Sequence, residues 1–340
     1  MSLISKLRPR KSSAAKLAAV GAAALKQEHE LSIDAMFGDP AAHLLIQWMD
    51  SNDWRTLRSF LASVPNHDDR AFYITAVLGT QDGLPAWLDE WIAEEPKSAM
   101  PWLLRGVRGT QWAWVVRGAG RGSSVSPEAY HLFRARLMQA DRDLLTAASL
   151  NASDPLPYAQ MLITARGLHL GYNALCTRFG EAVARDPLNY RAHTNMLQGI
   201  ARKWGGSHEL MYEFARAAVA TAPAGHRLHA LIAEAHIEGW VDGDRAHRHL
   251  YWKVPGIRAE IHHAAARSVE RPEFDAGGET AADRNVFAFC FWSFDEPEAL
   301  REQLDRIGDH LTRLPWAYAG EPTTVFTAAR RYAAEPGRVD

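Results

Sequence analysis

The stretch DPLPYAQMLITARGLHLGYNALCTRFGEAVARDP, residues 154–187, begins and ends with the same Asp-Pro pair, and the two pairs are 32 residues apart. Ala222-Pro223 follows 36 residues after the second pair, so two successive units have a mean length of 34 residues. Helical patterns fill each unit, and the proline ends it. This period predicts stacked helical units, because one short helical hairpin does not bury its apolar face alone.

The second half of the first unit has the residue spacing of a known repeat. Phe179, Ala182 and Pro187 have the spacing F-x2-A-x4-P of the second helix of a tetratricopeptide repeat. In the next unit Ala218 and Pro223 keep this spacing, whereas the phenylalanine lies one position early. The chain therefore resembles a degenerate tetratricopeptide-repeat (TPR-like) protein.

The resemblance extends in both directions. Trp102 and Gly106 follow Pro96 at the spacing of the aromatic residue and the glycine in the first helix of this repeat. The segment KWGGS, residues 203–207, is similar to one in uncharacterised bacterial tetratricopeptide-like proteins. The resemblance covers about residues 96–240, although the unit after Pro96 is longer than one period. It implies a right-handed array of antiparallel helical hairpins, an α-solenoid whose inner surface holds a peptide or another protein.

The pattern of the whole chain predicts an all-α fold. From Asp39 onward helical stretches alternate with short Gly, Pro, Asn or Asp segments, and strand patterns are nearly absent. We expect helices near 40–50, 53–63, 68–79, 84–95, 98–117, 126–150, 156–170, 172–185, 189–203, 208–221, 226–240, 244–253, 257–270, 284–293, 296–312 and 322–334. We expect a basic, flexible N-terminal tail at 1–38, the TPR-like array at 39–270 and a C-terminal helical cap at 271–340, with further helices capping the N-terminal end of the array.

Several helix starts are marked by capping residues. Asp39-Pro40 and Ser126-Pro127 place a capping side chain before a proline at the first helical position. Asp295 begins a capping box with a glutamate three residues on.

Glycine-rich segments indicate where one helix ends and the next begins. Gly205 should end one helix in a left-handed conformation, and Ser207 should cap the next. The least ordered links should be 118–124 and 271–279, where glycine and polar residues replace the apolar pattern.

Composition and charge limit the class of protein. The 340 residues are 47% hydrophobic and 23% charged, which is typical of a folded soluble protein and excludes a wholly disordered chain. No run of 18 apolar residues is present, so we expect no transmembrane segment. The two cysteines have no metal-binding spacing and suit a reducing, cytoplasmic compartment. Residues 1–27 hold six basic residues and no acidic one, which favours a solvated tail over a membrane or nucleic-acid anchor.

The candidate ligand-binding residues are arginines with a neighbouring tryptophan. Arg105, Arg108 and Trp112 share one helix face, at i, i+3 and i+7. Arg166 and Arg202 belong to the following units. If the first helix of each unit faces inward, the arginines line the groove and bind an acidic peptide or a partner protein. The alternative is a structural role, in which such arginines pair with acids of neighbouring hairpins, for example Asp141, Asp143 and Glu181.

Seven of the fifteen histidines lie between residues 226 and 263. His229 and His236 lie on one helix, and His247 or His249 from the following helix would complete a set of nitrogen ligands. The alternative function is therefore a metal-dependent or small-molecule-dependent enzyme, or a ligand-binding protein. No HExxH or other specific spacing supports a divalent metal, so we predict no cofactor.

The sequence favours binding over catalysis. No catalytic motif is present, and Gly205-Gly206-Ser207 lacks the further glycine and lysine of a phosphate-binding loop. We predict a cytoplasmic scaffold or adaptor that binds a protein or peptide on the concave face of its array. Nucleic acid is not expected as a partner, and the oligomeric state is left open.

Overall fold

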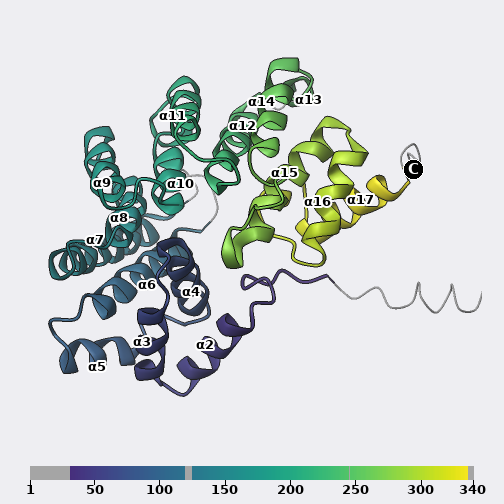
Figure 1. Cartoon of the computed structure of the whole chain (residues 1–340). Coiled ribbons are helices and arrows are strands. Elements are labelled where there is room, and N and C mark those ends of the chain that lie inside the picture. Colours follow the sequence, from purple (N-terminus) through teal and green to yellow (C-terminus); the bar gives the residue numbers. More distant parts are fainter. Residues whose placement is uncertain (1–30, 119–124, 245, 336–340) are drawn as a thin grey trace, which may run out of the picture.

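The computed structural model describes residues 31–118, 125–244 and 246–335 (Figure 1). Within these ranges the chain forms sixteen α-helices and four short 3-10 helices, without a strand. The first helices are α2 (Pro40–Asp50), α3 (Trp54–Ser63), α4 (His67–Gly79), α5 (Ala86–Glu94), α6 (Ala99–Arg117), α7 (Pro127–Leu150), α8 (Leu156–Leu168) and α9 (Tyr172–Arg185). They are followed by α10 (Tyr190–Gly199), η2 (Arg202–Trp204), α11 (His208–Ala220), η3 (Arg227–His229), α12 (Ala230–Asp242) and α13 (Arg248–Tyr251). The last elements are α14 (Pro255–Ala266), η4 (Gly277–Glu279), α15 (Thr280–Phe294), α16 (Pro297–Ile307), η5 (Trp316–Tyr318) and α17 (Pro322–Ala334).

An all-helical fold is confirmed, and each expected helical stretch contains a helix. The capping signals explain two of the starts. Asp39 accepts a hydrogen bond from the backbone N–H of Ala42 at 2.9 Å, and Ser126 accepts one from Ala129 at 3.2 Å. Ser207 caps α11 in the same way, after Gly205 in a left-handed conformation.

Several predictions about helix bounds and caps were wrong. The helix expected at 244–253 is the single turn α13. The α16 helix ends at Ile307 and not at 312, because Gly308 has a φ of +57°. Asp295 does not begin a capping box: it is the left-handed C-cap of α15, and Glu296 precedes α16 without a side-chain cap. Only Asp295 and Glu296 separate α15 from α16. Asp295 takes the left-handed conformation that ends α15, so it is not available to cap the start of α16.

The segment 271–279 is not a loose link, in contrast to the prediction. The Phe274 side chain is buried in it, and Glu279 pairs with Arg191 and Arg227 of the array. These contacts join the start of the C-terminal region to α10 and η3. The other predicted link and the predicted tail fall largely on residues 119–124 and 1–30, which lie outside the described residues.

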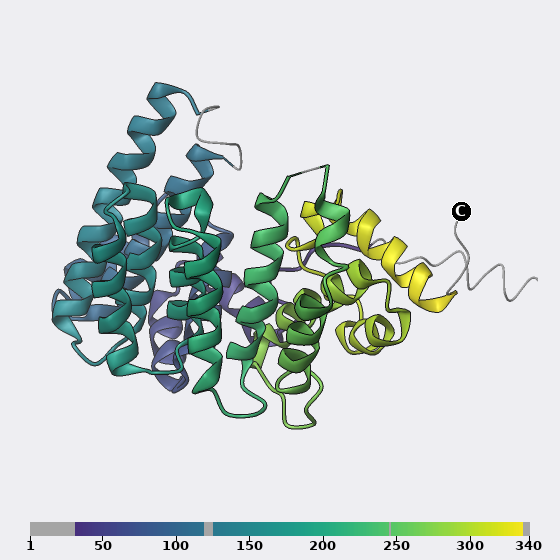
Figure 2. The same cartoon turned by 90° about the horizontal axis from the view of Figure 1, so that it is seen from above.

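Most helices that are adjacent in the chain pack side by side, as the view from above shows (Figure 2). The contact between α6 and α7 is especially close, because Gly106 has no side chain. A Cβ atom at Gly106 would lie 2.6 Å from Cγ of Leu144. Gly106 is the glycine that the repeat-like spacing singled out, and its role is this close approach of two helices.

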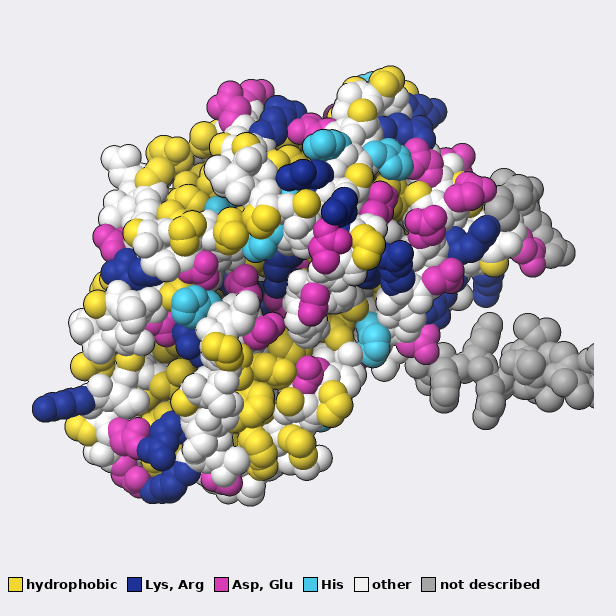
Figure 3. Space-filling model, in the orientation of Figure 1, with side chains coloured by type: hydrophobic (Ala, Val, Ile, Leu, Met, Phe, Trp, Pro, Cys, Tyr) yellow, Lys and Arg dark blue, Asp and Glu magenta, His cyan; other side chains and the backbone are white. Residues whose placement is uncertain are grey.

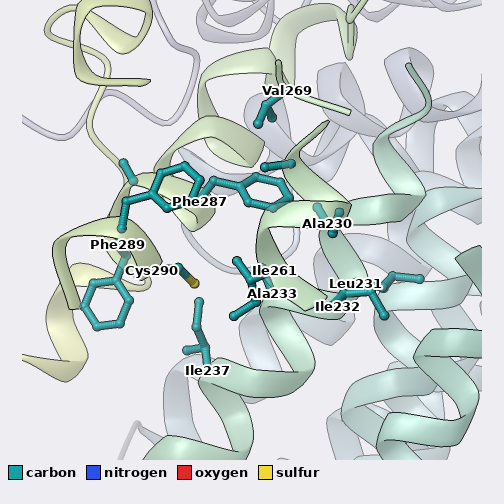
Figure 4. Close-up of a cluster of buried hydrophobic side chains, with 14 of the residues drawn as sticks. Ala230, Leu231, Ile232, Ala233, Ile237, Ile261, Val269, Phe287, Phe289 and Cys290 are labelled. Carbon is teal, nitrogen blue, oxygen red and sulfur yellow. The ribbon is translucent and has the colours of Figure 1, made fainter. Parts of the chain in front are cut away.

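The hydrophobic cores lie between successive helices. In the N-terminal part Trp87 and Trp91 are buried, and Trp91 stacks on Trp54 with ring centroids 5.0 Å apart. In the C-terminal part the side chains of Ile237 and Ile261 point toward Cys290, from α12, α14 and α15 (Figure 4). The tryptophans at helical spacing are therefore core residues.

Helices that are distant in the sequence also meet. Helix α4, near the N-terminus, contacts both α10 and η4 (Figure 1). As a result α4, α6, α8, α10 and α12 present side chains to shared pockets, which form the candidate site. No helix of the described chain is both long and apolar enough to cross a membrane.

Candidate functional site

The central pocket lies where α4, α6, α8 and α10 meet and has a volume of about 240 Å³. Its lining combines apolar side chains with mostly uncharged polar ones. The residues are Ala71, Ile74 and Thr75 from α4, Leu103, Val107, Thr110, Gln111 and Trp114 from α6, Leu156, Ala159, Gln160 and Ile163 from α8, and Arg191 and Asn195 from α10.

Helical periodicity explains how each helix contributes to this pocket. Leu103, Val107 and Trp114 lie at i, i+4 and i+11 on α6, which places them along one face. Leu156 and Ile163 are related in the same way by i+7 on α8. The stripes are visible in the sequence, but the contributions of α4 and α10 depend on contacts between helices that are distant in the sequence.

Three amide side chains enter the central pocket, each from a different helix. Gln111 donates to the backbone carbonyl of Thr75 at 3.3 Å, and Asn195 donates to that of Ala159 at 3.0 Å. Within the described chain the Gln160 amide makes no hydrogen bond to another residue. The pocket therefore keeps amide groups that can bond to the backbone of a bound peptide.

A second, acidic pocket of about 350 Å³ lies between α10, α12 and α15. Glu234 and Glu238, one turn apart on α12, line it together with Asp283 of α15. Tyr190 donates from its hydroxyl to Glu234 at 2.6 Å and lies 3.2 Å from Asp283. The surface around the boundary between the N-terminal and C-terminal helices carries mixed acidic and basic side chains (Figure 3).

The carboxylates of the acidic pocket differ in their partners. Arg227 donates two hydrogen bonds to Asp283, at 3.0 and 2.9 Å. Lys203 lies 2.6 Å from Glu238. Among the described residues Glu234 bonds only to the Tyr190 hydroxyl, and burial raises the pKa of Glu234 to about 7. A carboxyl group with this pKa changes its charge near neutral pH.

The two arginines of the predicted set on α6 make contacts within the protein. Arg105 donates to Asp143 at 3.0 and 2.8 Å and to Asp89 at 2.7 Å. Arg108 is buried and donates to the carbonyls of Leu78 and Gly83 at 3.1 and 2.6 Å. These contacts fit the alternative interpretation of the sequence, in which the arginines have a structural role. The other two named acids also pair with arginines, Asp141 with Arg178 and Glu181 with Arg185.

The remaining members of the predicted set lie apart from one another. The Trp112 ring lies under the guanidinium of Arg136, 3.3 Å from the ring centroid. Arg202 is exposed and lies 3.5 Å from Asp242. Arg166 lies beside Trp114 and Trp204. None of the five predicted residues lines the central pocket.

The histidines proposed as metal ligands have other neighbours. His229 lies 3.1 Å from the carbonyl of Pro223, and His236 lies between the Tyr251 hydroxyl and Glu260 at 2.9 and 3.1 Å. Burial lowers the pKa of both imidazoles. His247 lies 2.8 Å from Asp244, and His249 is exposed. Among the described residues no group of three or more His, Cys, Asp or Glu side chains is placed to hold a metal ion.

Sequence reasoning missed the acidic pocket, although a signal was present. Glu234 and Glu238 are the only charged residues apart from histidine in the apolar stretch ALIAEAHIEGW, residues 230–240, and the i, i+4 spacing puts them on one face. Two acids inside an otherwise apolar helix indicate a buried polar site. Their partners Tyr190 and Asp283 are distant in sequence and carry no such signal.

No protein-family model, curated protein or solved structure matches this chain. The assignment of a function therefore rests on the geometry of the pockets.

Proposed function

We propose that the chain is a protein- or peptide-binding scaffold, a TPR-like right-handed solenoid that holds a segment of a partner protein in its central pocket. The observation that carries the proposal is the composition of this pocket, in which four helices place apolar side chains beside amide groups. An extended peptide needs both kinds of contact, because its backbone must form hydrogen bonds while its side chains are buried.

The partner segment that fits best carries a large apolar side chain. Leu103, Val107 and Ile163 offer apolar contacts, whereas Arg191 is the one cation among the described residues that line the pocket. Arg191 already pairs with Glu279, so little positive charge is left for an acidic side chain. An apolar anchor flanked by backbone hydrogen bonds therefore explains the pocket better than the acidic peptide that the sequence suggested.

A peptide-display library selected on the full chain tests this proposal. The blocking variant is Ile163→Arg, which places a long charged side chain in the pocket from a half-buried position. The matched control is Val115→Arg, which adds the same charge at a side chain that is 72% exposed. We expect enriched peptides to share an apolar anchor, to bind the control like the wild type and to lose binding to the blocking variant.

The opposite results would contradict the proposal. One is a library in which no peptide is enriched over an unrelated helical protein. The other is a set of enriched peptides that bind Ile163→Arg as tightly as the wild type, provided that circular dichroism shows both variants folded.

A further inference from the structure

Arg166 differs from the other described arginines that are buried or half-buried. Each of those donates a hydrogen bond or forms an ion pair in the described chain; Arg178 on the next helix, for example, lies 2.8 Å from Asp141. Arg166 makes neither contact through its side chain, and its Nε atom is buried without a hydrogen-bond partner. The Arg166 side chain as a whole is half-buried. A buried donor without a partner is unfavourable, so the Nε atom favours a ligand that accepts a hydrogen bond.

Aromatic rings hold the Arg166 guanidinium in place. Its central carbon lies 5.3 Å from the centroid of Trp114 and 5.4 Å from that of Trp204. The two indoles meet edge to face at 5.7 Å. Arg117 contacts the same two rings, at 5.2 and 5.4 Å. Two guanidinium groups therefore share one pair of indoles, which concentrates positive charge at this end of α6 and α8.

The charges around Arg166 do not neutralise it. The acid whose charge acts on Arg166 is Glu238, and the Glu238 carboxylate is already bonded to Lys203 and Gln198. Burial lowers the pKa of Arg166 to about 10, which still leaves the group charged at neutral pH. Cation–π contact with the indoles stabilises the charge only in part.

Arg166 lines a pocket of about 220 Å³ that is distinct from the two pockets described above. The pocket lies at the end of α8, beside the start of α9 and the KWGGS segment. His169 and Tyr172 also line it, and both side chains are exposed. An imidazole and a hydroxyl beside a guanidinium are hydrogen-bond donors for an oxygen-bearing anion.

We propose that this pocket is an oxyanion-binding site, in which Arg166 pairs with a carboxylate or phosphate group. The ligand is a single small oxyanion, either free phosphate or an acidic group on a larger molecule. The site goes beyond the peptide binding proposed above, and its test uses small ions alone. If no oxyanion binds, the proposal that the central pocket binds a peptide still stands. If no peptide binds the central pocket, the proposal of an oxyanion site still stands.

The test measures the thermal midpoint of the full chain against the concentration of sodium phosphate, sodium acetate or N-acetyl-aspartate. Sodium chloride holds the ionic strength constant, since screening alone changes stability. The main variant is Arg166→Met, and the charge-matched control is Arg202→Met, whose side chain is exposed on the same segment as Trp204. We expect a saturable rise of the midpoint for the wild type and the control, and at least about tenfold weaker binding to Arg166→Met.

A second variant keeps the test valid if Arg166→Met does not fold. His169→Ala changes an exposed side chain that lines the pocket, and it should weaken binding because it removes a hydrogen-bond donor from the pocket. Stronger binding of phosphate than of carboxylates supports the site and indicates that its ligand is phosphate. The reverse order supports the site and indicates that its ligand is an acidic side chain of a larger molecule. The proposal is overturned if no oxyanion binds up to about 10 mM, or if binding is the same in Arg166→Met or His169→Ala as in the wild type.

Discussion

The Asp68 carboxylate accepts a hydrogen bond from the backbone N–H of Tyr190 at 3.1 Å, across 122 residues of sequence. Asp68 belongs to the first turn of α4, and Tyr190 is the first residue of α10. The side chain thus satisfies a free N–H group at the start of a helix far along the chain. Together with the ion pair of Arg191 and Glu279, this contact connects the N-terminal, middle and C-terminal helices around the pockets.

Replacement of Asp68 by alanine should lower the free energy of unfolding by about 1 kcal/mol, because α10 loses this cap. Asp68→Asn should have a much smaller effect, since an amide oxygen also accepts the bond and burial already raises the pKa of Asp68. Urea denaturation of the two variants measures the difference. Equal losses for alanine and asparagine would show that the negative charge, and not the hydrogen bond, is what matters.

The sequence predicts local structure well where a local cause exists. Asp39 and Ser126 begin helices because each side chain bonds to a backbone group three residues away. The error at Asp295 has a different origin, because that residue ends α15, whereas a capping pattern carries information only about the helix that comes after it. Local patterns therefore predict sixteen helical stretches but mistake a junction between two of them.

The candidate site was less predictable, because its residues come from helices that are distant in the sequence and meet only in the folded chain. The spacing of Arg105 and Arg108 correctly places them on one helix face, but it gives no information about Asp143, which lies 38 residues away and bonds to Arg105. Likewise Glu234 is visible as an acid in an apolar helix, whereas its bond to Tyr190 spans 44 residues. Charge partners of this kind are tertiary properties.

The bond between Arg105 and Asp143 predicts that Arg105→Ala destabilises the protein, by about 2 to 3 kcal/mol. Asp143 is only 2% exposed, so its carboxylate would lose its cation while staying out of water. The control is Arg55→Ala, whose ion pair with Glu94 is exposed on both sides and should contribute less than about 1 kcal/mol. Chemical denaturation measures both. A loss for Arg105→Ala no larger than the control would mean that the bond to Asp143 contributes little to stability.

The KWGGS segment should not tolerate a side chain at Gly206. A Cβ atom there would lie 1.8 Å from the carbonyl oxygen of Ile200, so the backbone must move, and we expect a loss of about 2 kcal/mol or more. Gly180 is the matched control: it lies within α9 with no atom near its missing Cβ, and Gly180→Ala should stabilise the protein by about 0.5 to 1 kcal/mol. Thermal denaturation should show shifts of opposite sign, and a shift of the same sign would contradict the packing at Gly206.

Glu234 should make the stability of the protein depend on pH. Its pKa is about 7 in the folded protein, against an ordinary value of 4.5, so the folded state binds more protons between these two values. Stability from this group is therefore complete below about pH 4.5 and is lost as the pH rises through 7. A shift of this size corresponds to about 3 kcal/mol at full burial, and to less for a side chain that keeps some contact with water.

The variant Glu234→Gln removes this dependence while it keeps an acceptor for the Tyr190 hydroxyl. We expect it to be more stable than the wild type at pH 8, by about 1 to 3 kcal/mol, and to show a difference that shrinks toward pH 5. Glu238→Gln is the comparison on the same helix face, and it should lose stability at both pH values because Lys203 loses its carboxylate partner. Urea titrations at pH 5, 6, 7 and 8 give the differences. A Glu234→Gln variant that is less stable than the wild type at pH 8 would contradict this prediction. It would mean that an interaction other than the bond to Tyr190 stabilises the ionised Glu234 carboxylate in the protein without a ligand.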